Sequence, residues 1–145
     1  YETSAFARPG ARCRHNLNYW QFGDYLGLGA GAHSKLSHPD GIERQARLRH
    51  PRDYMRHAGR PEALQEQRRL DQVDRVFEFM MNALRLTEGV PTYLFQERTG
   101  LPLDAARNGL LAAEDQGLLT VAADRITPTP RGRRYLNDLL ALFLP

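Results

Sequence analysis

The sequence predicts an α+β fold that is mostly α and is built from two unlike parts. Residues 1–65 contain short apolar stretches interrupted by glycine and proline, whereas residues 66–145 repeat apolar residues every three or four positions. The second spacing is the period of amphipathic helices. We therefore expect a strand-containing first part, 1–65, and a helical second part, 66–145, whose element order is that of a winged helix-turn-helix domain.

In the first part, the alternation of large and small residues over 1–7 predicts a short strand that ends at Pro9. A chain that starts within a strand is expected to be a piece of a longer protein. The apolar, glycine-spaced run 25–33 predicts a buried strand that leads into a tight turn. Residues 34–65 are polar and carry scattered proline and glycine. For them we expect an extended crossing segment with one short helix near 53–57.

In the second part, the periodicity predicts four helices and one hairpin. The helices are expected over residues 66–85, 91–98, 102–116 and 130–144, and the hairpin strands over 118–121 and 126–127. Gly117 is the expected C-terminal cap of the third helix.

The charge of the third helix argues against DNA binding. It offers Asp104, Glu114 and Asp115 against Arg107 and Asn108, whereas a duplex reader needs basic or amide side chains there. We expect no nucleic-acid partner. A winged helix that faces a protein or has a structural role is favoured, and a DNA-binding module is kept as an alternative.

Composition points to a globular protein. Apolar residues make up 41% and charged residues 26%, which is ordinary globular usage. No run approaches the roughly 20 apolar residues of a membrane helix, and no signal peptide is recognisable. The single cysteine, Cys13, cannot form an internal disulfide, which is consistent with a cytoplasmic protein.

The basic charge is concentrated at the start. Residues 1–69 carry 12 basic and 7 acidic side chains, net +5, whereas residues 70–145 carry 8 and 10, net −2. Arginine, which pairs bidentately with carboxylate and phosphate, dominates. An anionic ligand of the first part is one interpretation, and an arginine-rich proteome is the other.

The densest candidate site combines a histidine with two large aromatic residues. His15 and Asn16 are followed by Tyr19 and Trp20. An imidazole can bind a metal while aromatic rings cover a flat apolar ligand. The alternative is that both aromatic residues belong to the core and that the histidine is hydrogen-bonded in a loop.

Three arginines, Arg8, Arg12 and Arg14, lie close to this histidine in the sequence. Guanidinium groups pair with carboxylates. Heme or another porphyrin combines a metal or pyrrole centre, a flat apolar face and two propionates. On the heme interpretation, His15 is a ligand of the iron and the three arginines are partners of the propionates; the core interpretation of the same residues stays open at this point.

Other motifs carry less. The run 27–31 lacks the last glycine of a dinucleotide fingerprint and the lysine of a P-loop. The histidine pairs 33/38 and 50/57 lack the further ligands of a zinc site. A nucleophile at Cys13 activated by His15 has no third group to orient the base. We reject both glycine-loop interpretations, expect the histidines to be solvated loop residues, and do not pursue a catalytic cysteine.

Together these residues resemble a known family. The stretches Tyr1–Ala7, Cys13–Trp20 and Gly23–His33 are similar to the end of the barrel in the oxygen-independent coproporphyrinogen III oxidase family, on its heme-chaperone (HemW-type) side. Residues 77–86 and 136–140 resemble the C-terminal domain of that family. The resemblance covers essentially the whole chain.

The resemblance implies a radical-SAM partial barrel that holds a 4Fe-4S cluster and S-adenosyl-L-methionine, followed by a helical domain. Residues 1–65 would be the remnant of the last barrel strands. Because this chain has only Cys13, it cannot ligate the cluster and is expected to be inactive alone. By resemblance, His15, Asn16, Tyr19 and Trp20 are the heme-binding residues. The loop residues near the cofactor and substrate are Gly29, Gly31, Ala32 and His33.

The implied function is heme binding and delivery to respiratory apoproteins. Peripheral membrane association through such a partner is part of this expectation. An oxygen-independent coproporphyrinogen III oxidase, which decarboxylates its substrate oxidatively in heme biosynthesis, is the enzymatic alternative. Unpaired strand edges in the first part would also invite pairing between copies, so we expect the isolated chain to be a homodimer or an aggregate.

Overall fold

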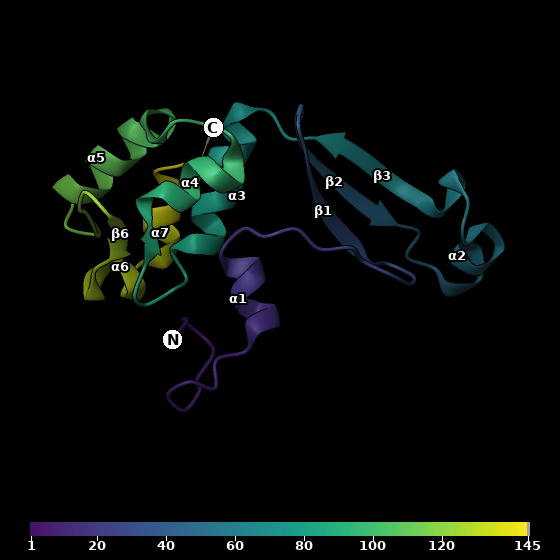
Figure 1. The fold of residues 1–145 in the computed structure, drawn as a ribbon, viewed down its shortest axis with the longest axis horizontal. Coiled ribbons are helices and arrows are strands. Elements are labelled where there is room, and N and C mark those ends of the chain that lie inside the picture. The colour runs from purple at the N-terminus through teal and green to yellow at the C-terminus, as the bar shows by residue number, and fades with distance from the viewer. Residues whose placement is uncertain (145) are drawn as a thin grey trace. The chain divides into compact units, whose positions relative to one another are not determined.

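The computed structural model describes residues 1–144, which form two compact units (Figure 1). The first unit joins residues 1–23 to the residues from 72 onward, and the second consists of residues 24–71. The described residues contain seven α-helices and two three-stranded sheets. The expected α+β class is confirmed. The assignment of 1–65 to a barrel remnant and of 66–145 to a winged-helix domain stays a prediction.

The core of the first unit lies around helix α3, Gln72–Ala83. Phe79 is fully buried, and its ring lies 5.1 Å from the ring of Phe95 and 6.0 Å from that of Phe22. Phe95 belongs to α4, Thr92–Thr99, which ends at Gly100 in a left-handed conformation. Burial of these aromatic rings fixes α3 and α4 against the chain that follows α1.

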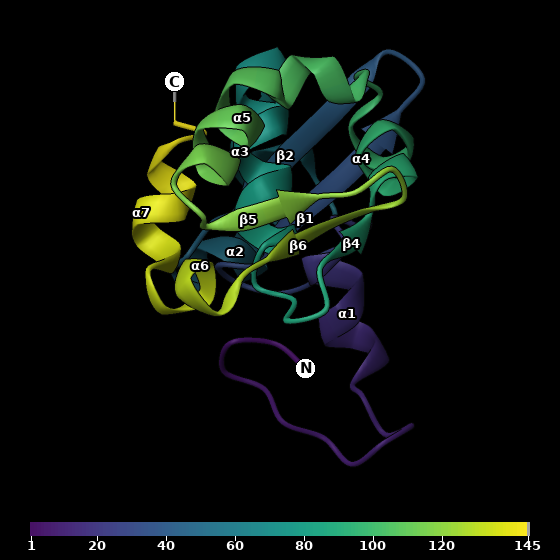
Figure 2. The same cartoon turned by 90° about the vertical axis from the view of Figure 1, so that its left-hand side faces the viewer.

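The rest of the first unit is a small sheet and four helices. The strand order is β4 (Val90–Pro91), β6 (Arg125–Pro128), β5 (Leu119–Val121), and all pairs are antiparallel. Figure 2 shows β5 and β6 side by side as a hairpin. The remaining helices are α1 (Arg14–Trp20), α5 (Arg107–Asp115), α6 (Pro130–Arg134) and α7 (Leu136–Ala141).

The hairpin and the helix at 91–98 are confirmed within a residue or two, but other boundaries differ. The helix expected from residue 66 begins at Gln72, because residues 64–69 pair as a strand instead. The third helix starts as a 3-10 turn, Leu103–Ala106, before α5. The helix expected over 130–144 is two helices, because Tyr135 (φ −113°, ψ 48°) breaks the helical conformation between them.

The strand expected over residues 1–7 is wrong. Glu2 makes only isolated bridges, to Ala5 and to Leu86. Thr3 N donates to the Arg85 carbonyl and Thr87 N donates to the Tyr1 carbonyl, both at 3.1 Å. The segment is therefore a tight turn, because Glu2 pairs with Ala5 within the segment itself. The hydrogen bonds to residues 85 and 87 hold this turn against the chain that follows α3.

The second unit is a three-stranded antiparallel sheet of order β1 (His33–His38), β2 (Gly41–Arg47), β3 (Leu64–Arg69). The extended crossing segment expected over 34–65 is thus wrong, although the short helix is confirmed as α2, Pro51–His57. A 3-10 turn, Pro61–Ala63, precedes β3.

The buried strand expected over 25–33 is also wrong. Tyr25 makes a single bridge to Lys35, and Leu26 and Leu28 are 60% and 78% exposed. Positive φ angles at Gly29 (103°) and Gly31 (71°) turn the chain into β1. Within residues 1–144, no helix is both long enough and apolar enough to cross a lipid bilayer.

Candidate functional site

The candidate site lies on α1, whose C-terminal end is anchored in the core. Cys13 precedes the helix in an extended conformation, and its carbonyl accepts from Leu17 N at 3.0 Å. After Trp20, Phe22 N donates to the Tyr19 carbonyl at 2.9 Å, and Phe22 adopts φ 56°. The buried Phe22 ring then anchors the end of the helix in the core. The side chains of α1 are therefore presented by a fixed element.

The structure brings His15 and Tyr19 together. They are four residues apart, and their rings meet edge to face with centroids 4.7 Å apart and an interplanar angle of 89°. His15 is exposed and Tyr19 is half-buried. An imidazole in this position is open to a ligand and has an aromatic ring beside it.

Trp20 contacts a ring outside the predicted motif. Its ring lies 5.7 Å from the ring of Tyr1 at 65°, and Trp20 is half-buried. Asn16, also half-buried, precedes Trp20 by one helical turn. The structure thus divides the predicted motif into a His15–Tyr19 pair and a Trp20–Tyr1 pair.

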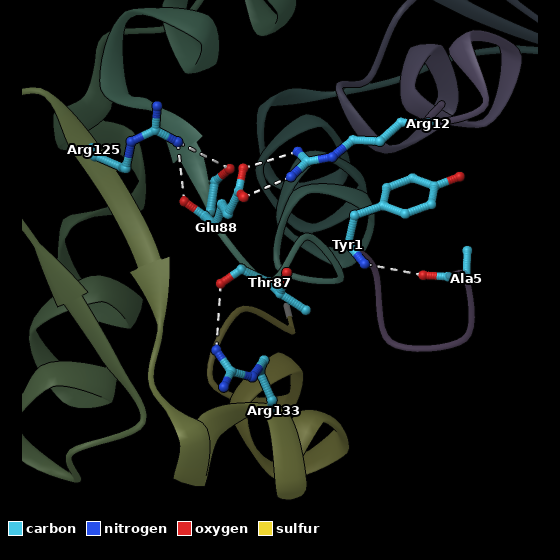
Figure 3. Close-up of polar contacts among 8 residues, drawn as sticks. Tyr1, Ala5, Arg12, Thr87, Glu88, Arg125 and Arg133 are labelled. Atoms are coloured by element: carbon cyan, nitrogen blue, oxygen red, sulfur yellow. Dashed lines mark hydrogen bonds and ion pairs between the residues drawn. The ribbon is translucent and has the colours of Figure 1, made fainter. Parts of the chain in front are cut away.

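The three arginines near His15 are not equivalent. Arg12 donates to both carboxylate oxygens of Glu88, at 2.8 and 2.6 Å, and its guanidinium carbon lies 5.6 Å from the Tyr1 ring centroid (Figure 3). The hydrogen bonds from Arg12 lower the pKa of Glu88. Arg8 and Arg14 are exposed, and neither pairs with a carboxylate anywhere in residues 1–144. Of these three arginines, Arg8 and Arg14 are therefore the two that have no carboxylate partner in the described residues.

Glu2, which follows the Tyr1 that contacts Trp20, is a buried acidic residue that the sequence did not single out. It is 2% exposed, accepts from Ser4 N at 2.9 Å and Ser4 Oγ at 3.0 Å, and lies 2.5 Å from Arg85 Nη2. Burial alone would raise the pKa of Glu2. The Ser4 hydrogen bonds and the Arg85 charge together outweigh burial, so the net pKa lies below its usual value. An acidic residue inside an otherwise uncharged stretch was the only sequence signal.

The predicted loop residues Gly29, Gly31, Ala32 and His33 lie in the second unit. Gly31 N donates to the Leu48 carbonyl at 2.8 Å, and Gly29 N donates to the Tyr54 hydroxyl at 3.3 Å. His33 is exposed at the start of β1. The glycines turn the chain into β1, and the expected place of these four residues near cofactor and substrate stays a prediction.

The donor set does not fit an iron–sulfur cluster. Cys13 is the single cysteine and is exposed. Residues 1–144 contain no group of three or more His, Cys, Asp or Glu side chains placed to hold a metal ion. A 4Fe-4S cluster requires several cysteine ligands, so this chain offers no site for one. An exposed imidazole beside an aromatic ring does suit a heme iron.

Comparisons with known proteins show what the chain is similar to. Residues 70–135 match the family described as the HemN C-terminal domain. The chain is 50% identical over 145 residues to the heme chaperone HemW of Escherichia coli (strain K12). That match covers 99% of this chain and 37% of the relative. It is 46% identical over 145 residues to the heme chaperone HemW of Haemophilus influenzae, with the same coverage of 99% and 37%.

One solved structure is similar in fold. Coproporphyrinogen III oxidase (HemN) from Escherichia coli, described as a radical SAM enzyme, superposes with a TM-score of 0.57 at 18% identity. The match covers 83% of this chain and 28% of that one. The chain also spans only part of the two HemW relatives, little more than a third of the length of each.

Proposed function

We propose that this chain, which is homologous to the heme chaperones HemW and carries a HemN C-terminal domain, binds heme on α1 as part of a longer chaperone. His15 is the axial ligand, Tyr19 packs on the macrocycle, and Arg8 and Arg14 pair with the propionates. The longer protein delivers this heme to respiratory apoproteins in the cytoplasm. Membrane association, where it occurs, is peripheral and runs through the acceptor.

The observation that carries the proposal is the exposed imidazole of His15 with the Tyr19 ring 4.7 Å away. Axial histidine is a standard ligand of heme iron, and the flat macrocycle gains free energy from aromatic contact. The exposed Arg8 and Arg14 supply charge for acid groups. Arg12 has no part in this, because Glu88 holds it.

The wider architecture belongs to the same proposal. The order α3, α4, α5, the β5–β6 hairpin and α6–α7 supports a winged-helix-like domain. Residues 1–65 contribute the last strands of a radical-SAM barrel in the longer protein. There, S-adenosyl-L-methionine and a 4Fe-4S cluster are held by residues outside this chain. Copies of the isolated chain pair as a homodimer through the exposed segment that carries Leu26 and Leu28.

The test is a heme titration of the full-length protein, followed by absorbance. His15→Ala is compared with His38→Ala, which removes an exposed histidine of the second unit. The proposal expects a weaker affinity and a changed Soret band for His15→Ala alone. Equal titrations of both variants and the parent remove His15 from the role.

A separate assay addresses the enzymatic alternative. The full-length protein is incubated with coproporphyrinogen III, S-adenosyl-L-methionine and a reductant, and protoporphyrinogen is measured. A chaperone forms none. Product formed in proportion to enzyme identifies an oxidase instead.

A further inference from the structure

The first unit has a second basic site, on α6, that the heme proposal does not use. Pro130, Arg131, Arg134 and Tyr135 line a shallow depression of about 550 Å³ that is largely open to solvent. Arg131 and Arg134 are exposed, and neither pairs with a carboxylate in the part of the chain that the structure describes.

The backbone under these two arginines is locked. Gly132 is buried, and a Cβ there would lie 1.8 Å from the Leu118 carbonyl oxygen. Thr129 Oγ1 accepts from Gly132 N at 3.0 Å and donates to the Gly117 carbonyl at 2.8 Å. α6 therefore cannot rotate without losing its cap and its contact with the hairpin.

The three arginines of α6 have different roles because of this lock. Arg133 Nη1 donates to the Thr87 carbonyl at 3.3 Å and thus points into the unit (Figure 3). Arg131 and Arg134 are three residues apart, which places their Cβ atoms about 5–6 Å apart on one helical face. Two guanidinium groups on one fixed face form a site for a doubly charged anion.

Tyr135 adds an apolar wall. Helix α6 ends there, and the Tyr135 side chain is 50% exposed. A half-exposed aromatic ring next to two guanidinium groups suits a flat ligand that carries an acid group.

We propose that the α6 depression binds an oxyanion carried on a flat apolar molecule, with Arg131 and Arg134 pairing with the anion and the Tyr135 ring packing on the flat body. The carboxylates of a porphyrin and the phosphate of a nucleotide share this chemistry. The site uses none of the α1 residues, so it stands apart from the proposed function.

The experiment uses the full-length protein and four probes: metal-free protoporphyrin IX, its dimethyl ester, AMP and inorganic phosphate. Binding is followed by fluorescence for the porphyrins and by calorimetry for the phosphates. The double variant Arg131→Gln/Arg134→Gln is compared with Arg107→Gln, which removes an exposed arginine of α5 that lies 3.6 Å from Asp104. Circular dichroism checks that every variant is folded.

In an Arg8→Gln/Arg14→Gln background, which removes the proposed propionate partners near α1, the proposal expects the double variant to bind protoporphyrin at least tenfold more weakly, and Arg107→Gln to bind it normally. The dimethyl ester, which lacks the charges, should bind weakly and equally to all proteins. Tyr135→Phe should retain affinity, and Tyr135→Ala should lose several-fold. If AMP rather than protoporphyrin depends on the two arginines, the site takes a nucleotide phosphate, and the shared chemistry stands.

Equal binding of all four probes to the double variant and to Arg107→Gln overturns the proposal. His15→Ala serves to separate the two sites. In the His15→Ala variant, protoporphyrin binding should still depend on Arg131 and Arg134. The Soret band of bound heme should differ from that of the parent.

Discussion

The Glu88 carboxylate holds Arg12 through both oxygens, at 2.8 and 2.6 Å, and Arg125 Nη1 donates to the Glu88 carbonyl at 3.0 Å (Figure 3). Arg12 is therefore occupied before any ligand arrives. Arg12→Gln should change heme affinity by less than about twofold, because no propionate contact is lost. Arg8→Gln and Arg14→Gln should each weaken it about tenfold, the worth of one charge-assisted hydrogen bond. Titration of the three variants checks this, and an Arg12→Gln effect as large as the others contradicts it.

Glu2→Gln should destabilise the fold by about 1.5–3 kcal/mol, because a buried carboxylate loses its charge opposite Arg85. The folded-state pKa of Glu2 is lowered, so its contribution is complete above the unfolded pKa and is lost as pH falls through the folded pKa. The stability difference between the parent and Glu2→Gln should thus be constant at neutral pH and shrink on acidification below about pH 4.5, the usual glutamate value. Urea denaturation from pH 7 to 3 measures it. A difference that grows with acid refutes the assignment.

In the second unit, Lys35 is 1% exposed, and its Nζ donates to Asp24 Oδ1 at 2.9 Å. Burial alone would raise the pKa of Asp24. The hydrogen bonds from Lys35 and Ser37 outweigh burial, so the net pKa lies below its usual value. Asp24→Ala should destabilise the protein by about 1–3 kcal/mol, because it removes the carboxylate that neutralises a buried ammonium, although Asp24 itself is 43% exposed and solvent weakens the pair. Lys35→Met should cost less, because it removes the charge and keeps the stem. Chemical denaturation of both variants compares them, and the reverse order would contradict a stabilising ion pair between Asp24 and the buried Lys35.

Gly132→Ala should destabilise the first unit by more than about 2 kcal/mol, because its Cβ would overlap the Leu118 carbonyl at 1.8 Å and backbone must move. Asn137→Ala, at an exposed position of α7, is the control and should change stability by less than about 0.5 kcal/mol. Thermal melts of both variants test the difference. Matching melting temperatures would show that α6 is not locked against the hairpin.

The second part of the chain was predictable because its elements have strong local signals. The apolar residues Val76, Phe79, Met80 and Ala83 recur at helical spacing and are buried in α3. The hairpin at 119–128 follows from two short apolar runs around a polar turn. Both features depend on residues close in the sequence.

The second unit was not predictable in the same way. Strand β3 reads Leu-Gln-Glu-Gln-Arg-Arg and has no apolar alternation, so its pairing with β2 could not be inferred from period alone. The turn at residues 1–7 was missed for a related reason. Its shape depends on Arg85, which lies more than 80 residues away.

The sequence named residues of the candidate site but did not predict which of them contact one another. The spacing of His15 and Tyr19 by four residues brings their rings together once α1 forms. The contact between Trp20 and Tyr1 and the ion pair between Arg12 and Glu88 are tertiary, and no local pattern encodes them.

The central claim is that the imidazole of His15 ligates heme iron, and a ligand exchange tests it most directly. The full-length His15→Met variant is loaded with ferric and ferrous heme, and its absorption and electron paramagnetic resonance spectra are compared with those of the parent. A thioether in place of an imidazole should change the Soret maximum and the g-values. Spectra identical to those of the parent would show that another residue binds the iron.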